Sequence, residues 1–454
     1  MNLFQLVLKQ MRQRSLSTWL TMLSVTLGVG LAIAVMIFYY QGGKVFGQSN
    51  FGYEVIVGHP GSPLQLVMNT VYQIDRSPGN IPYALYEEML TRNSRYYKDV
   101  RIAVPYAVGD TWRGHRIIGT LPKLFGVDDE GSPLPTQQVL EYQLGDRYAM
   151  ALGRVFHPRK FEAIVGSEIA SKEGLKIGDK FHATHGNPGP NEKPDIHAEE
   201  WQVVGVLQPT HTASDRVLFI PLQTFYAISE HEKGLQQQAI VKGTTAPTEG
   251  EDEPKHYTLN PDGTVEVTLP KAEWQISAIL IKARGSTPAQ DLIYTINNRD
   301  EAIAVNPAGV MREFFETFLK GGTLVLLLVS ALVTIVAAVG ILVSIYNSVA
   351  ARKREIAILR ALGATRQRVL GLICMEAGLI GLGGGILGLI VGHLLGGFGS
   401  LYLNQLLGQR LNWIAFWPPE WLYLAGVVLL SVFAGLVPAL KAYRTPVATN
   451  LVAG

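Results

Sequence analysis

The sequence predicts an α-helical membrane protein with four transmembrane helices and a large α+β extracytoplasmic domain inserted between helices 1 and 2. Three observations lead to this fold class. No charged residue lies between Lys320 and Arg352, and three other apolar stretches are also long enough to cross a membrane. Between the first and second of these four stretches lies a more polar segment of about 275 residues, enough for one or two folded domains.

The apolar stretch before Arg352 gives the clearest membrane signal. From Thr323 to Tyr346 it contains about fifteen Leu, Ile and Val residues, which together favour insertion by roughly 5 to 9 kcal/mol. Its length of about 24 residues, at ~1.5 Å per residue, covers a hydrocarbon core of ~30 Å with some tilt. A core helix of a soluble protein rarely needs so long a stretch without a polar residue.

The four spans divide the chain into nine segments. We predict transmembrane helices at residues 18–40, 319–347, 369–398 and 421–440. Between and around them we predict an interfacial helix at 1–17, the external domain at 41–318, a cytoplasmic helix at 348–368, an external loop at 399–420 and a tail at 441–454. The apolar part of the first span is longer than a cleaved signal peptide usually carries, so we interpret it as a retained anchor.

The distribution of basic residues predicts the orientation. Short loops rich in Lys and Arg stay in the cytoplasm, whereas long domains are translocated largely regardless of charge. Basic residues cluster before the first span, between the second and third, and after the fourth, and both termini are therefore predicted to be cytoplasmic. The clusters are Lys9, Arg12 and Arg14; Arg352, Lys353, Arg354, Arg360, Arg366 and Arg368; and Lys441 and Arg444. The net charge of only +2 argues against nucleic acid as a partner.

Alternating apolar and polar residues predict an α+β arrangement for the external domain. We expect strands at 53–58, 100–108, 113–120, 180–184, 201–207, 216–221 and 276–283, and helices at 82–90 and 288–297. Gly109-Asp110 is the expected turn between two of the strands, and Ser167 the expected cap of a helix that follows a strand at 163–166. Segments 186–200 and 243–270 are rich in Pro and acidic residues, so we expect surface loops there.

The residue types needed for catalysis or for cofactor binding are not found in a recognisable arrangement. Cys374 is the only cysteine, which excludes a disulfide framework and a paired-cysteine metal site. His182 and His185 are a candidate metal-binding pair, but residues i and i+3 of a strand point to opposite faces, so we predict no metal site. The only Gly-Lys pair, at Gly43, is followed by Val45 and cannot form a phosphate-binding loop. We therefore expect the chain to bind no cofactor and to be no enzyme.

The segment after the second span has the pattern of a short amphipathic helix. Ile356, Leu359 and Leu362 recur at helical spacing on one face, and Gly363 can adopt the left-handed conformation that ends a helix. Such a helix presents an apolar ridge with polar flanks to a partner. The alternative is a helix that lies on the membrane surface and has no partner.

The third span contains a glycine every fourth residue. Gly384, Gly388, Gly392 and Gly396 share one helix face and allow another helix to approach closely. This other helix can belong to the same chain or to a second copy, and both alternatives stay open. Glu376 lies about one turn into this span, and we expect it to reach the interface or to pair with Arg366 or Arg368.

These motifs resemble those of the membrane subunits of MacB, LolC/LolE and FtsX type ATP-binding-cassette (ABC) systems. The most specific part is the segment from Arg354 to Thr365, which is similar to the family pattern R-E-I-x-x-L-R-A-x-G-A-[ST]. Residues 166–170, 177–179, 203–206 and 217–222 are similar to the family's external MacB-like domain, and residues 437–447 to its ending. The resemblance covers nearly the whole chain.

The resemblance implies partners as well as a fold. In this family the amphipathic segment is a coupling helix that docks on a separate cytoplasmic ATPase, which holds the ATP. Its residues here would be Arg354, Glu355, Ile356, Leu359, Arg360, Leu362, Gly363 and Ala364. The resemblance further implies a second permease subunit, identical or different, allows a periplasmic or outer-envelope partner, and places the chain in the bacterial inner membrane. Only about 17 residues precede the first span, so we expect no fused ATPase domain.

The resemblance also suggests a function and leaves one alternative. The expected function is that of a permease subunit of a mechanotransmission-type ABC transporter, which uses ATP hydrolysis to handle lipoprotein, lipid or amphiphilic cargo outside the membrane. The alternative is an FtsX-like regulator that activates a cell-wall hydrolase without transporting cargo.

Overall fold

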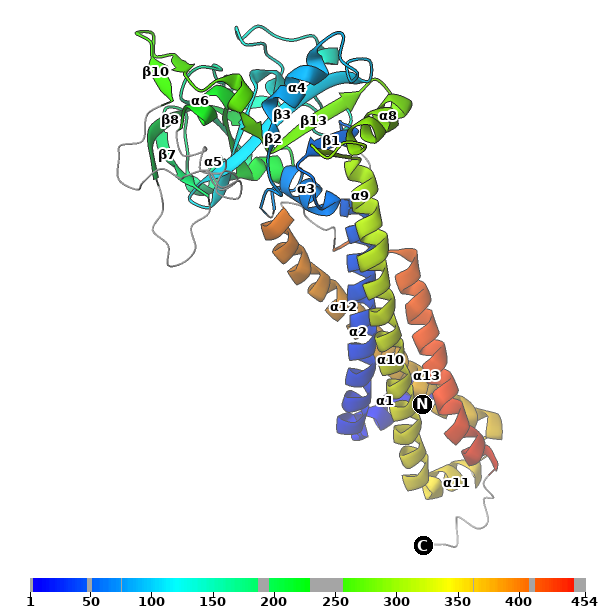
Figure 1. The fold of residues 1–454 in the computed structure, drawn as a ribbon. Helices are drawn as coiled ribbons and strands as arrows, with labels where there is room; N and C mark the ends of the chain where they lie inside the picture. The colour runs from blue at the N-terminus through cyan, green and yellow to red at the C-terminus, as the bar shows by residue number, and fades with distance from the viewer. Residues whose placement is uncertain are drawn as a thin grey trace, which may run out of the picture. The chain divides into compact units, whose positions relative to one another are not determined.

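The computed structural model describes residues 3–46, 51–74, 76–186, 196–228, 256–361, 363–407 and 413–444. The chain divides into two compact units, which are described separately (Figure 1). The helical unit contains Met1–Val45, Phe315–Asn404 and Arg410–Gly454. The αβ unit contains Phe46–Phe314 and Gln405–Gln409.

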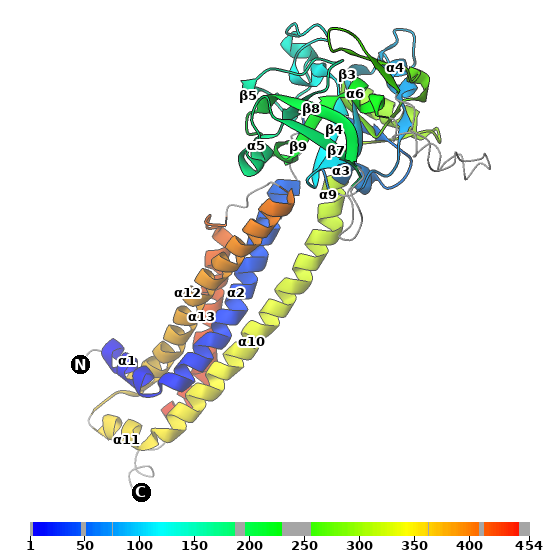
Figure 2. The ribbon, with the colours of Figure 1, turned by 90° about the vertical axis from the view of Figure 1, so that its left-hand side faces the viewer.

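Within the described residues, four helices are long and apolar enough to cross a membrane, as predicted. They are α2 (Ser15–Phe46), α10 (Lys320–Ala351), α12 (Arg366–Leu407) and α13 (Pro418–Arg444), and each overlaps one predicted span. Two short helices, α1 (Leu3–Gln13) and α11 (Lys353–Ala361), accompany them, and a π-helical turn at Phe315–Leu319 precedes α10. Figure 2 shows α1 and α11 at the same end of this unit.

The glycine face of α12 packs directly against α2. A Cβ atom added at Gly388 would lie 2.5 Å from the Cβ of Val29 and 3.0 Å from the carbonyl oxygen of Thr26. Gly384 and Gly392 meet α2 in the same way one turn before and one turn after, and Gly396 meets Ile37. Of the two alternatives left open by the sequence, the structure shows the contact within the chain.

Hydroxyl groups connect three of the long helices. The Tyr423 hydroxyl on α13 lies 3.0 Å from Thr334 Oγ1 and 3.4 Å from Ser330 Oγ, both on α10. Ser330 in turn donates to the carbonyl oxygen of Gly28 on α2, at 3.0 Å. In a membrane such hydrogen bonds hold helices together, since lipid offers no alternative partner. The sequence reasoning had not singled out these residues.

The αβ unit is built on a ten-stranded sheet. Its strands are β1 (Val55–Gly58), β3 (Val100–Trp112), β4 (His115–Thr120), β5 (Met150–Gly153), β6 (Glu162–Val165), β7 (Lys180–His185), β8 (Ile196–Leu207), β9 (Val217–Pro221), β13 (Ala278–Ala283) and β14 (Ile303–Val305). The order is β14-β1-β13-β3-β4-β9-β6-β8-β5, and β7 pairs with both β3 and β8. Strands β3, β4, β9, β6, β8 and β7 therefore close into a ring, a small barrel.

The long strand β3 belongs to both parts of this sheet. Its first half, from Val100 to Tyr106, pairs with β13, and its second half, from Ala107 to Trp112, pairs with β4 and β7. Shorter elements complete the unit. They are β2 (Ile81–Pro82), β10 (Tyr257–Leu259), β11 (Val265–Val267), β12 (Gln275–Ile276), α3 (Pro63–Thr70), α4 (Tyr83–Leu90), α5 (Ser167–Glu173), α6 (Leu222–Ala227), α8 (Ser286–Asn297) and α9 (Pro307–Phe314).

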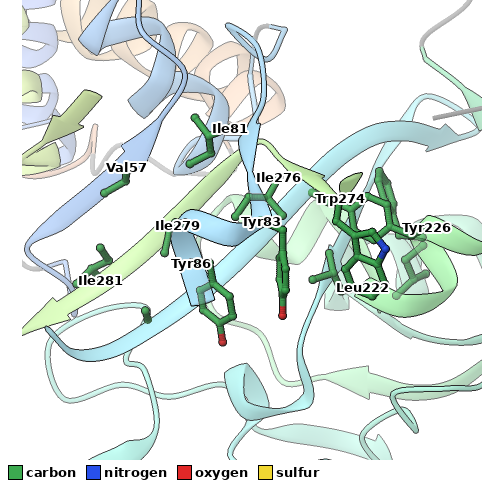
Figure 3. Close-up of a cluster of buried hydrophobic side chains, with 14 of the residues drawn as sticks. Val57, Ile81, Tyr83, Tyr86, Leu222, Tyr226, Trp274, Ile276, Ile279 and Ile281 are labelled. Atoms are coloured by element: carbon green, nitrogen blue, oxygen red, sulfur yellow. The ribbon is translucent and has the colours of Figure 1, made fainter. Parts of the chain in front are cut away.

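Apolar side chains from strands and helices form a large core cluster in the αβ unit. Figure 3 shows Ile279 and Ile281 of β13 near Tyr83 and Tyr86 of α4. Beside them the ring of Trp274 stacks on that of Tyr226 from α6, with centroids 4.5 Å apart. Alternate residues of β13 face this core because strand side chains point to opposite faces in turn.

The expected turn at Gly109-Asp110 is wrong. Both residues lie within β3, and the turn follows at Arg113 and Gly114, whose φ angles of 49° and 80° are left-handed. The pairing of β3 with β4 shifts register between Val108 and Thr111, so Gly109 marks a bulge instead of a chain reversal. A lone glycine within a strand often has this role.

Two further local predictions need correction. Ser167 is the first residue of α5 and not its cap, because Gly166 takes the N-cap position without a side-chain hydrogen bond. The predicted loops contain strands: Ile196–Glu200 begins β8, and β10 pairs with β11 within 243–270. The remaining parts of these loops, 187–195 and 243–255, lie outside the described residues.

An ion pair between an exposed arginine and a buried carboxylate lies at the start of β6. Arg154 donates two hydrogen bonds to the carboxylate of Glu162, at 2.7 and 2.6 Å, and the His157 N–H donates a third at 2.8 Å. Burial raises the pKa of Glu162, but these hydrogen bonds outweigh burial and hold the pKa of this carboxyl below its usual range. The pair therefore stabilises the fold only while the carboxyl is ionised.

We predict that Gly388→Ala destabilises the helical unit. The added methyl group would overlap Val29 and the Thr26 carbonyl, and overpacking of this kind costs about 1–3 kcal/mol. The matched control is Gly340→Ala on α10, where a Cβ meets nothing within 4 Å. Thermal unfolding of the detergent-solubilised chain should show a lower midpoint for Gly388→Ala alone. Equal midpoints for the two variants would contradict the packing described.

We predict that Arg154→Gln lowers the stability at pH 7 by about 1–2 kcal/mol, since it removes two charge-assisted hydrogen bonds. A carboxyl with a lowered pKa contributes stability above its unfolded value of about 4.3 and loses it as the pH falls through the folded value. The difference from wild type should therefore shrink below about pH 4 in thermal unfolding followed by tryptophan fluorescence. Lys180→Gln, which removes the exposed pair with Glu200, is the control and should change little. A difference that is independent of pH would refute this account.

Candidate functional site

The candidate site is the short helix α11, which follows α10 after a turn at Arg352. Gly363 ends it with a φ angle of 96°, so the predicted left-handed conformation is confirmed. The Gly363 N–H donates to the Arg360 carbonyl at 3.1 Å, and the Ala364 N–H to the Leu359 carbonyl at 3.0 Å. These bonds satisfy carbonyl groups that the helix end would otherwise leave without partners.

The apolar residues of α11 point in two directions. Ala357 is buried and Ile356 packs against the core of the helical unit. Ile358 and Leu359 are 44% and 37% exposed. The single ridge predicted from Ile356, Leu359 and Leu362 is therefore divided, since α11 uses its inner face to hold on to the bundle. Leu362 lies outside the described residues.

The polar residues of α11 surround the exposed pair. Lys353, Arg354 and Glu355 are exposed and Arg360 is half-buried, as is Ala364 after the end of the helix. The sequence reasoning missed Ile358, because this residue does not share the i, i+3 spacing of the predicted ridge. Two adjacent large apolar side chains, exposed on a short capped helix between charged residues, form a surface suited to a protein partner.

The carboxylate of Glu376 interacts electrostatically with basic residues at the junctions of other helices. It is buried on α12, and the cations that act on its carboxylate are Arg352, at the start of α11, and Arg14, between α1 and α2. The expected partners Arg366 and Arg368 are not these cations, and the Arg366 guanidinium lies over the Tyr443 ring. The chain brings Arg352 and Arg14 close only through folding, so their spacing in sequence gave no signal.

A second buried polar contact joins α12 to α13. His393 Nε2 lies 3.1 Å from Glu420 Oε2, and its Nδ1 contacts the carbonyl oxygen of Trp413. Both side chains are buried. His393 is an ionisable residue within the third predicted span, 369–398. Ionisable groups in membrane helices are usually paired inside the bundle, as this one is.

Residues with metal-ligand spacing lie in the αβ unit. Among the described residues, Asp110, His185 and His197 form the one such group. His182, which forms the candidate pair with His185 in the sequence, instead contacts the backbone carbonyl oxygens of His197 and Glu199. His182 and His185 therefore do not belong to the same group of potential metal ligands.

Comparison with known proteins places these features in a family. Residues 18–255 match the family model for a MacB-like periplasmic core domain, and residues 327–447 match that for an FtsX-like permease C-terminal domain. The chain belongs to the FtsX/MacB family of ABC transporter permeases. Helix α11 lies within the FtsX-like segment.

Two relatives agree with this family. The chain is 31% identical over 139 residues to an uncharacterized ABC transporter permease, MJ1507, of Methanocaldococcus jannaschii, which covers 30% of this chain and 34% of that protein. It is 29% identical over 148 residues to the ABC transporter permease YtrF of Bacillus subtilis, which covers 30% and 33%. The matches thus span about a third of the length of these relatives.

Family membership carries a few general consequences. ABC transporter permeases work with a cytoplasmic ATPase partner and are generally not catalytic themselves. The apolar helices together with the MacB-like periplasmic domain fit a protein of the inner membrane.

Proposed function

We propose that this chain is the permease subunit of a mechanotransmission-type ABC transporter. It couples ATP hydrolysis by a separate cytoplasmic ATPase to the handling of lipoprotein, lipid or another amphiphile outside the membrane. The observation that carries the proposal is the divided apolar surface of α11, with Ile356 and Ala357 packed on the bundle and Ile358 and Leu359 exposed.

This surface suits a helix that receives force. A docking helix must be attached firmly to its own subunit as well as to its partner, or it would only swivel when pushed. The contacts of Ile356 and Ala357 provide the attachment, and Ile358 and Leu359 offer the ATPase an apolar contact with charged residues around it. Gly363 keeps the helix short and well terminated.

Helix α10 is suited to carry the movement onward. It has 32 residues in one helix, which at ~1.5 Å per residue spans about 48 Å. Ser330 and Thr334 connect it to α2 and α13 at mid-length. A displacement of α11 would therefore move α10 together with its neighbours instead of bending it.

The cargo is proposed to stay outside the membrane. Glu376, His393 and Glu420 are ionisable residues of the long helices that are buried within the helical unit, and His393 contacts Glu420. A conduit for charged solutes usually presents such groups to a water-filled cavity. A second permease subunit completes the transporter in this proposal, and its contact lies away from the glycine face of α12, which α2 occupies.

We predict that replacing Ile358 and Leu359 with aspartate abolishes association with the ATPase. Two charges on the docking surface would have to be desolvated, while the inner face of α11 is unchanged. The amount of ATPase that co-purifies in mild detergent should fall at least about tenfold, which corresponds to a loss of about 1.4 kcal/mol or more in binding free energy. Leu144→Asp, at an exposed leucine of the αβ unit, is the matched control and should retain it. Unchanged association in the double variant would contradict the proposal.

The same variant also separates transport from regulation in cells. Under the proposal, cells that depend on it accumulate lipoprotein in the inner membrane. A cell-wall or division defect with normal lipoprotein sorting would instead favour the regulation of a hydrolase.

A further inference from the structure

Three strands of the αβ unit bring an aspartate and two histidines together. Asp110 comes from β3, His185 from β7 and His197 from β8, and one ligand atom of each lies within 4.8 Å of the other two. Asp110 Oδ1 is 3.4 Å from His197 Nε2 and 3.6 Å from His185 Nδ1. The two imidazole rings stand perpendicular, with an interplanar angle of 89°, so they approach the carboxylate from different directions.

We propose that Asp110, His185 and His197 form a binding site for a divalent first-row transition cation, with Zn²⁺ as the expected ion. Zinc binds histidine nitrogen and carboxylate oxygen at about 2.0–2.2 Å in tetrahedral geometry. Two ligand atoms of such a site are then about 3.3–3.6 Å apart. The two separations from the Asp110 oxygen, 3.4 and 3.6 Å, agree with this value.

Burial and charge favour an ion at this position. Asp110 is 1% exposed and His197 4% exposed. Buried carboxylates in proteins are paired with a cation or coordinate a metal ion, and neutral imidazole is a common metal ligand. A divalent cation can be coordinated by the carboxylate and by both imidazole rings at once. The side chain of His185 is 38% exposed, so the fourth position of the cation can be taken by water or by a group from outside.

The position of the cluster gives the ion a role. It lies at the seam where β7 closes the barrel between β3 and β8. The pairing of β3 with β7 contains only two residue pairs, Asp110 with His185 and Thr111 with Thr184. Gly186 adds a bond from its N–H to the Gly109 carbonyl, at 2.9 Å. An ion bound by residues of all three strands would stabilise the short pairing of β3 with β7.

His182 provides a natural comparison on the same strand. Its Nδ1 lies 3.2 Å and 3.0 Å from two backbone carbonyl oxygens, those of His197 and Glu199, and the residue is exposed. Residues three apart on a strand face opposite sides, so His182 is not a ligand although it is close in sequence. It is therefore a suitable control for nonspecific binding by surface histidines.

The test is a titration of the metal-free, full-length chain in detergent with Zn²⁺ against a chromogenic chelator. The proposal predicts one Zn²⁺ per chain for wild type and for His182→Ala. Asp110→Asn and His185→Gln should each weaken binding at least about tenfold, which is the lower end of what even the loss of an outer partner costs a metal site. Zn²⁺ should also raise the thermal midpoint of wild type, and not that of His185→Gln.

Each outcome decides the question. His185→Gln alters a half-exposed side chain, so it tests the site even where Asp110→Asn fails to fold. Absence of stoichiometric binding by wild type, or equal binding by wild type and His185→Gln, would overturn the proposal and leave a hydrogen-bonded Asp–His cluster. A loss of binding in His182→Ala alone would place the metal elsewhere and overturn it too.

Discussion

The close contact of α2 and α12 is the constraint on which the helical unit depends. Glycines at 384, 388 and 392 remove the side chains that would keep the two backbones apart, and Val25, Val29 and Ile33 fill the space. Apolar side chains gain little free energy by moving from lipid into a helix contact. Helices in a membrane are therefore held together by close packing and by hydrogen bonds between them. The hydroxyl groups of Ser330, Thr334 and Tyr423 then attach α10 and α13 to this pair.

The contact also explains how α11 is positioned. When α12 lies against α2, Glu376 comes under the influence of Arg14 and Arg352, which belong to the junctions at α1 and α11. Ile356 and Ala357 add apolar contacts at the same end. The helix that we propose to contact the ATPase is thus attached to the bundle by charge and by packing, and both are needed if it is to transmit force.

The sequence correctly predicted the features that depend on residues close together in the chain. Four spans, the short helix with its glycine end and most strands follow from composition and local periodicity. Contacts between distant residues could not be predicted: the partners of Glu376 and the Asp110, His185 and His197 cluster arise from the pairing of strands and helices far apart in sequence. The predicted turn at Gly109 was wrong for a related reason. Glycine is common in bulges and in turns, and only the pairing with partner strands distinguishes the two. Ile358 was not predicted because it does not share the i, i+3 spacing of Ile356, Leu359 and Leu362.

The most direct test of the account is photo-crosslinking from α11 in intact membranes. A photoreactive amino acid at position 358 should crosslink to a protein that mass spectrometry identifies as an ABC ATPase, with a yield that changes when ATP hydrolysis is blocked. The same probe at Leu144, in the αβ unit, should give no such product. Crosslinks from position 358 to lipid alone, in cells that contain the ATPase, would show that α11 lies on the membrane surface and would contradict the account.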